Sequence, residues 1–350
     1  MICWSRDTVP ELPQRISGNG KYAIRYWYER LEPFFPILGT GYSISAHDSE
    51  EFEKVTFVPV QEELPVRVTL VPKTLKAPRV IAIEPVCMQY AQQAIQSFLY
   101  GQIESFWLTS GHVNFTDQTI NQRMALTSSS TGQYATIDLS DASDRVFHDL
   151  ALDMFNSNPD LRDAIDACRS TSALLPDGRI VSPLWKFASM GSALCFPVEA
   201  MYFYTICVAS RLKKHNLPVT HENIFDVSRD IYVYGDDIIV PVDDAGTVLD
   251  YLQKYNCKVN FTKTFFTGRF RESCGVDAYD GYEVTPTYIR RLRPENRQQV
   301  DRIISWVATA NLFYLKGYWK TASLMFCTCE KILGDLPYVS MKPSALGRVS

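Results

Sequence analysis

Two adjacent aspartates, Asp236 and Asp237, interrupt an apolar stretch that reads DIYVYGDDIIVPV over residues 230–242. Like charges in contact repel each other, and burying carboxylates is costly unless a cation compensates them. A solvated turn and a metal site would both accommodate such a pair. Asp138 ends the apolar segment ATID, and it would supply a third carboxylate if the two segments pair as neighbouring strands.

Three converging carboxylates favour hard divalent cations, because Mg²⁺ prefers carboxylate oxygen as a ligand. Two such ions can activate an attacking hydroxyl and stabilise a leaving oxygen in phosphoryl transfer. We therefore interpret Asp138, Asp236 and Asp237 as a candidate site for two Mg²⁺ ions, with Mn²⁺ as a substitute. Taken alone, an Asp-Asp pair at a turn is more often structural, since Asp favours turns.

The segments that carry these carboxylates read as strands. Ile231 and Val233 precede YGDD and Ile238 and Val240 follow it, so two strands are expected to meet at a turn. Gly235 would supply the unusual backbone angle of that turn.

The other segments show further patterns. Two hairpins are predicted, over 64–85 with a loop near Thr74 to Pro78, and over 172–183 around Asp177-Gly178. Residues 133–155 are predicted to form a strand, a turn and a helix, with Ser143 or Asp144 as the N-cap. Further helices are predicted over 87–103, 243–256 and about 296–333. These elements describe an antiparallel sheet backed by helices, which is an α+β arrangement.

The longest apolar run, residues 191–210, is long enough to span a bilayer. Pro197 and Glu199 lie near its centre, where a charge is costly in a membrane. The run therefore predicts a buried helix of a soluble protein.

Composition sets broader bounds. The 350 residues are 46% hydrophobic and 21% charged, as in an ordinary globular protein. The net charge of −4 does not indicate nucleic-acid binding, so a polyanion would have to meet local basic patches. Nine scattered cysteines favour reduced thiols in a cytosolic setting, and the N-terminus lacks the pattern of a signal peptide.

A set of motifs in fixed order resembles the RNA-dependent RNA polymerases, most closely the replicase catalytic subunit of single-stranded RNA bacteriophages (the levivirus group). The motifs are VPKTLKAPRVIAIEP, DQTINQRMAL, ATIDLSDASDRV, LLPDGRIV, FASMGSALCFPVEA, VYGDDIIVP, NFTKTF, GRFRESCG and VTPTYIR. Each is weak alone, and their joint order over about residues 64–291 carries the resemblance.

The resemblance implies a right-hand polymerase with an antiparallel palm sheet. Fingers would occupy 1–130, the palm 131–290 and a small helical thumb 291–350. Members of that group are usually longer ahead of the entry-path motif, so the fingers are expected to be partial. The implied activity is template-directed RNA synthesis from ribonucleoside triphosphates on single-stranded RNA, by two-metal nucleotidyl transfer, in viral genome replication.

The resemblance also implies roles for single residues. Asp138 and Asp236 would bind the metals with Asp237 in support, and Lys263 would be a general acid or an electrostatic partner for pyrophosphate. The implied nucleotide-binding residues are Lys73, Lys76 and Arg79 on the entry path, Asp144 at the ribose 2′-hydroxyl, and Ser189, Gly191 and Ser192 in a flexible loop. Simpler interpretations remain open, since the entry-path cations could be a solvated face and Lys263 a surface lysine.

RNA contacts are implied for Arg269 and Arg271, which would meet the primer or product strand. Arg290 and Arg291 belong to the segment YIRRLRPENRQQVDR at 288–302. This segment contains five arginines and two acidic residues, and its positive charge favours contact with phosphates. Phage replicases of this type work in the cytoplasm of a bacterial host and recruit host translation elongation factors and a ribosomal protein. The resemblance implies the same partners and no membrane for this chain.

One departure affects ribose selection. Related replicases often carry Asn-Gly after SMG, where this chain has Ser192-Ala193. An amide there can bond both the first-motif aspartate and the ribose, and a serine hydroxyl replaces only part of that.

Three other functions stay open. A reverse transcriptase shares paired aspartates but usually lacks Gly at position 235. A catalytically incomplete fragment would bind RNA or partners without catalysis. A metal-dependent nuclease would need clustered acids but not the ordered motif set.

Overall fold

The computed structural model describes residues 26–36, 55–72, 78–340 and 345–349. It divides into two compact units. The first contains Met1–Thr69 with Ile81–Val284, and the second contains Leu70–Val80 with Thr285–Ser350. The first unit therefore holds all three candidate carboxylates. The expected division into fingers, palm and thumb stays a prediction.

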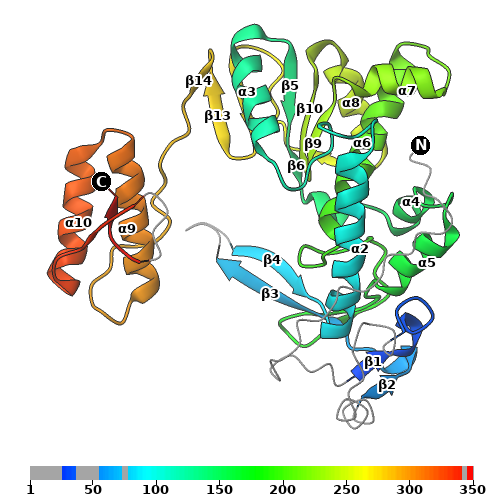
Figure 1. The fold of residues 1–350 in the computed structure, drawn as a ribbon, viewed down its shortest axis with the longest axis horizontal. Helices are drawn as coiled ribbons and strands as arrows, with labels where there is room; N and C mark the ends of the chain where they lie inside the picture. The colour runs from blue at the N-terminus through cyan, green and yellow to red at the C-terminus, as the bar shows by residue number, and fades with distance from the viewer. Residues whose placement is uncertain (1–25, 37–54, 73–77, 341–344, 350) are drawn as a thin grey trace. The chain divides into compact units, whose positions relative to one another are not determined.

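A three-stranded antiparallel sheet lies in the upper part of the first unit as drawn in Figure 1. Its order is β5 (Tyr134–Ile137), β10 (Asp237–Pro241) and β9 (Tyr232–Tyr234). Three consecutive residues of β10, from Ile238 to Val240, are buried, so both faces of this strand are covered. The predicted pairing of the two carboxylate-bearing segments is confirmed.

Helices cover this sheet. The contacting helices are α3 (Thr119–Thr131), α6 (Cys195–Lys214) and α8 (Val242–Lys254), and α6 also packs against α2 (Val86–Ser105) and α7 (His221–Ser228). Most residues of α6 are buried, which confirms the buried-helix interpretation of the long apolar run. Among the residues that the structure describes, no helix is long and apolar enough to cross a membrane.

Further short strands form small sheets. A four-stranded sheet has the order β4 (Pro78–Ile83), β3 (Val66–Pro72), β7 (Ala173–Leu174) and β8 (Ile180–Val181). A second sheet has the order β12 (Phe270–Ser273), β13 (Val276–Tyr279) and β14 (Tyr282–Glu283). The two-stranded pairs are β1 (Tyr26–Tyr28) with β2 (Thr56–Val58), and β6 (Leu139–Ser140) with β11 (Lys258–Val259). Both predicted hairpins therefore form, although the loop predicted near Thr74 lies mostly outside the described residues.

Short helices link these strands. They are the 3₁₀ helices η2 (Glu29–Leu31), η4 (Val60–Glu62) and η5 (Ala142–Arg145), and the α-helices α4 (His148–Asp153) and α5 (Pro159–Ala167). The prediction of Ser143 or Asp144 as an N-cap is wrong. Both residues lie inside η5, and α4 starts only after Phe147, which makes no side-chain cap. Asp141, at a φ of 56°, turns the chain into η5 instead.

The second unit is a helical hairpin with its own core. Helices α9 (Val300–Leu315) and α10 (Trp319–Leu333) pack through Ile303, Val307, Met325 and Phe326, as predicted for the C-terminal region. A short parallel pair, β15 (Tyr338–Val339) with β16 (Arg348–Val349), completes this unit.

Candidate active site

The Gly-Asp-Asp turn is a tight hairpin between β9 and β10. Tyr234 pairs with Asp237, so Gly235 and Asp236 form the two-residue connection. Gly235 has a φ of +62°, and a Cβ there would lie 2.2 Å from the ring of Phe196 on α6. Glycine is therefore required twice, by the backbone angle and by the aromatic ring beneath it. The turn exposes Asp236 and leaves Asp237 partly buried at the start of β10.

Asp138 lies beside this turn because Ile137 pairs with Ile238. Its carboxylate Oδ2 accepts a 2.7 Å hydrogen bond from the Asn260 side-chain amide, and its carbonyl accepts one of 2.9 Å from the Asn260 backbone N–H. Asn260 follows β11, so a segment 122 residues further along the chain orients this carboxylate. The bond to Asn260 uses one oxygen of Asp138.

The charges at the turn disfavour one another. Burial, followed by repulsion from Asp236, raises the pKa of Asp237 from 3.8 to about 6. Burial also raises the pKa of Asp138, with Asp236 adding to the shift and Asn260 and Lys263 opposing it. Both carboxylates thus bear an electrostatic cost that a bound cation would relieve.

A buried glutamate is influenced by the charge of Asp236 as well. Glu199 on α6 is 8% exposed, and it contacts the Cys195 thiol at 3.7 Å. Burial, then the charges of Asp236 and Asp144, raise the pKa of Glu199 from 4.5 to about 8. Burial and the neighbouring carboxylates therefore favour the protonated, neutral form of this side chain.

The donor chemistry at the turn fits a hard divalent cation, since Asp138, Asp236 and Asp237 offer carboxylate oxygens. Within the described ranges, no three His, Cys, Asp or Glu side chains are arranged to hold one ion together. The backbone thus brings the three aspartates near one another without a preformed ligand cage.

The loop that contains Ser189, Gly191 and Ser192 is held by two elements. The Ala82 N–H on β4 donates to the Met190 carbonyl at 2.8 Å, and Gly191 has a φ of +128°. A Cβ on Gly191 would lie 2.0 Å from the Ala82 carbonyl oxygen, so only glycine fits here. Ser192 is buried and bonded to α2.

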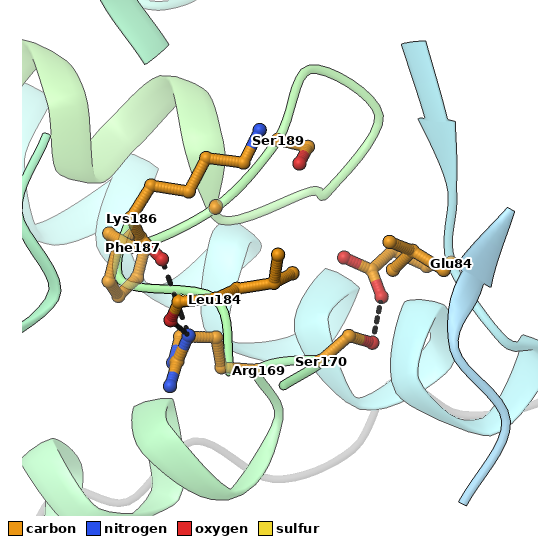
Figure 2. Close-up of a pocket in the computed structure, with 9 residues that line it drawn as sticks. Glu84, Arg169, Ser170, Leu184, Lys186, Phe187 and Ser189 are labelled. Carbon is orange, nitrogen blue, oxygen red and sulfur yellow. Dashed lines mark hydrogen bonds between the residues drawn. The ribbon is translucent and has the colours of Figure 1, made fainter. Parts of the chain in front are cut away.

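A cavity beside this loop is lined by Val66 on β3, by Glu84 just after β4, and by Ser170 and Ser189, among others. Figure 2 shows the Glu84 carboxylate turned toward the Ser170 hydroxyl, which donates to it at 2.5 Å. Arg169 points to the carbonyls of Leu184 and Lys186 on the opposite wall. These contacts hold in place the segment at residues 184–186, which leads into the loop.

The motifs lie within a stretch of the chain that matches a known protein family. A family model described as RNA replicase, beta-chain, covers residues 51–305. The chain belongs to this family.

Two replicase-family relatives indicate how much of the family's length is present. The RNA-directed RNA polymerase beta chain of Escherichia phage MS2 is 36% identical over 222 residues, which are 63% of this chain and 37% of that protein. The RNA-directed RNA polymerase subunit beta of Qbeta virus (strain MX1) is 36% identical over 220 residues, or 63% and 34%. The chain thus spans little more than a third of these relatives. A solved RNA-dependent RNA polymerase of a human picorbirnavirus has a TM-score of 0.49 at 11% identity, covering 76% of this chain and 57% of that one.

Two replicase residues predicted to act on the nucleotide are held in ion pairs. Asp144 pairs with Lys186 at 2.5 Å, and Lys263 pairs with Glu272 on β12 at 2.8 Å. The Glu272 hydrogen bond, with help from Asp138 and Asp237, raises the pKa of Lys263, so the lysine stays charged. A charged lysine beside Asp138 is compatible with the predicted role at pyrophosphate.

The predicted RNA contact of Arg271 is wrong. This residue is 1% exposed, and its guanidinium donates to the carbonyls of Tyr134, Gly268 and Phe270 at 2.6 to 3.1 Å. A buried arginine bonded this way ties β12 to β5 and cannot reach a ligand. Arg269 is exposed and pairs with Asp280 at 2.6 Å, so its contact with RNA stays a prediction.

The other predicted basic residues belong to the second compact unit or fall outside the described ranges. Lys73 and Lys76 fall among the residues that the structure does not describe. Arg79, Arg290 and Arg291 belong to the second compact unit, and Arg79 and Arg290 are exposed. Their predicted contacts with nucleotide and RNA remain predictions.

Sequence reasoning missed three polar residues of the site. Asn260 orients Asp138, and Ser273 donates to the Asp237 carboxylate at 3.3 Å. The pKa of Glu199 responds to the charge of Asp236. Asn260 and Ser273 lie inside the motifs NFTKTF and GRFRESCG, so the motif order was a usable signal. A polar residue between a strand and a turn would have been the clue for both.

Proposed function

We propose that this chain carries out template-directed RNA synthesis, as an RNA-directed RNA polymerase acting on single-stranded RNA. The observation that carries the proposal is the pairing of β5 with β10, which sets Asp138 beside Asp236 and Asp237. Replicase relatives named RNA-directed RNA polymerase support the reaction class. The phage relatives support replication of a viral RNA genome, and we propose the cytoplasm of a bacterial host as its location.

We infer that Asp138 and Asp236 would hold divalent cations, with Asp237 in support. Mg²⁺, or Mn²⁺ in its place, would supply charge neutralisation and activation of the attacking hydroxyl when bound. Asn260 keeps one oxygen of Asp138 bonded and so limits the directions in which this carboxylate can turn. Lys263 would stay charged and stabilise the departing pyrophosphate.

The nucleotide would lie against the loop at Ser189 and Gly191, with Asp144 near its ribose. The pair between Asp144 and Lys186 then has to open or to turn toward the ribose when the nucleotide enters. Arg79 on the entry path, and Arg269, Arg290 and Arg291 along the RNA, would supply positive charge to phosphates. The beta-chain name of the relatives favours a complex with further subunits, for which host translation elongation factors and a ribosomal protein are the candidates.

A second candidate is supported by the coverage of the relatives. The match covers 37% of the MS2 protein. The second candidate is therefore a catalytically incomplete chain that binds RNA or partners without catalysing synthesis. Binding of a short single-stranded RNA, measured by filter retention, separates RNA binding from synthesis in the same preparation.

The test uses the purified chain with Mg²⁺, four ribonucleoside triphosphates and a short single-stranded RNA template. Asp236→Asn keeps the shape of the side chain and removes its charge, and RNA synthesis should fall by at least about 100-fold. Asp226→Asn on α7 changes an exposed aspartate and should leave synthesis unchanged.

Each outcome decides one point. Equal synthesis by the parent and Asp236→Asn would refute the role of the turn. RNA binding without synthesis, even after host elongation factors are added, would favour the second candidate. Faster incorporation of deoxyribonucleotides than of ribonucleotides would indicate a reverse transcriptase instead.

A further inference from the structure

Gln92 on α2 is a fully buried amide with a partner on each side of its head group. Its Oε1 accepts hydrogen bonds from the Ser192 hydroxyl at 3.0 Å and from the Ala193 N–H at 3.1 Å. Its Nε2 donates to the Cys168 carbonyl at 2.7 Å, and its exposed fraction is zero. The Ala193 N–H can only donate and the Cys168 carbonyl can only accept, so these two groups fix the orientation of the Gln92 amide.

A buried amide is costly unless its atoms are bonded, so such an arrangement specifies one geometry. Glu84 extends the network, because its carboxylate is hydrogen-bonded to both Ser170 and Gln92. Gln92 thus joins three segments that are distant in sequence: the end of β4, the chain after α5, and the start of α6. None of these bonds involves the carboxylates of the Gly-Asp-Asp turn.

The segment that Gln92 holds is the continuation of the glycine loop. Met190 is bonded to Ala82 on β4, and Gly191 packs its backbone directly on that strand. Ser192 and Ala193 come next and are bonded to Gln92. The loop therefore has two anchors, a backbone anchor on β4 and a side-chain anchor on α2.

We propose that Gln92 is a positioning residue for the nucleotide loop, and that it takes the Ser192 hydroxyl away from the nucleotide. This inference rests on the proposed function for its link to the nucleotide. Ser192 donates its hydroxyl proton to Gln92 and accepts from the Leu194 N–H at 3.3 Å. Recognition of the ribose then depends on where the loop lies, and not on a direct contact with Ser192.

Gln92→Met tests the anchor, because methionine has a similar length and no hydrogen-bonding amide. Loss of the two bonds to Ser192 and Ala193 should let the loop leave its position, which lowers the fraction of protein that is competent to bind nucleotide. We expect the KM for ribonucleoside triphosphates to rise about tenfold while kcat changes by less than about threefold. Gln93→Met places the same residue on the exposed side of α2 and should change neither quantity.

Hydrogen exchange supplies a readout that does not depend on activity. In Gln92→Met, the peptide that contains residues 187–195 should exchange about tenfold faster, with α2 itself unchanged. Ser192→Ala removes the hydroxyl partner and leaves the Ala193 bond, so a smaller acceleration is expected. This second variant also serves if Gln92→Met does not fold.

The outcomes separate the two proposals. Unchanged exchange at 187–195 in folded Gln92→Met and in Ser192→Ala would overturn the anchor. Faster exchange with an unchanged KM would overturn the link to the nucleotide. Faster exchange in a preparation whose parent makes no RNA would support the anchor while the proposed function fails.

Discussion

Glu199 should make the folded protein less stable as pH rises from about 5 to about 8. Burial and the charge of Asp236 raise the pKa of Glu199 from 4.5 to about 8. The folded protein keeps this proton through a range in which the unfolded chain loses it, so stability is highest below the range and falls through it. The slope from this one group is about 1.4 kcal/mol per pH unit. Because Glu199 is 8% exposed, water screens this effect little.

Glu199→Gln keeps the shape of the side chain and removes the titration. We compare the free energy of unfolding of the variant with that of the parent at each pH. The difference, variant minus parent, should be about 3 kcal/mol larger at pH 8 than at pH 5. Urea denaturation at both pH values, with a chelator present to exclude cations, measures the difference. Glu222→Gln on α7 changes an exposed glutamate and serves as the control. Parallel pH curves for the parent and Glu199→Gln would refute the reasoning.

Two further substitutions test the backbone fit and the buried arginine. Gly191→Ala forces a Cβ to within 2.0 Å of the Ala82 carbonyl and should lower the free energy of unfolding by at least about 2 kcal/mol, whereas Gly101→Ala, in open space on α2, should raise it by about 0.5 to 1. Urea midpoints compare the two, and equal shifts would contradict the steric account. Arg271→Met should cost about 3 kcal/mol or more by leaving carbonyls unpaired, while exposed Arg269→Met should cost little and weaken RNA retention on a filter. A stable Arg271→Met protein with weakened RNA binding would restore the original expectation for Arg271.

The parts of the fold that follow from local chemistry were predictable from the sequence. The hairpins at Asp177-Gly178 and at Gly235 form as predicted, because each turn needs a positive φ that glycine supplies. The buried helix α6 also follows from composition, since a long apolar run with one acid is typical of a core element. The neighbouring positions of Asp138 and Asp236 required only that the two apolar strands pair.

The parts that depend on distant contacts were not predictable. Arg271 looks like any basic residue in a strand, and its burial depends on carbonyls of Tyr134 and of a turn that no local pattern announces. Gln92 fits the polar positions of an amphipathic helix, yet it faces the core because polar partners meet it there. Helix α4 starts after Phe147 because η5 takes up the residues that resemble an N-cap.

Because Gly235 packs against Phe196, the residue types allowed at these two positions, 39 residues apart, depend on each other. With a side chain at 235 only 2.2 Å from the aromatic ring, a larger residue could enter the turn only after position 196 had become smaller. Phe196 also packs edge-to-face on Tyr234, so its truncation would loosen the strand that precedes the turn. A lineage that exchanges this glycine would therefore have to cross a less stable intermediate, and we expect the two positions to change as a pair.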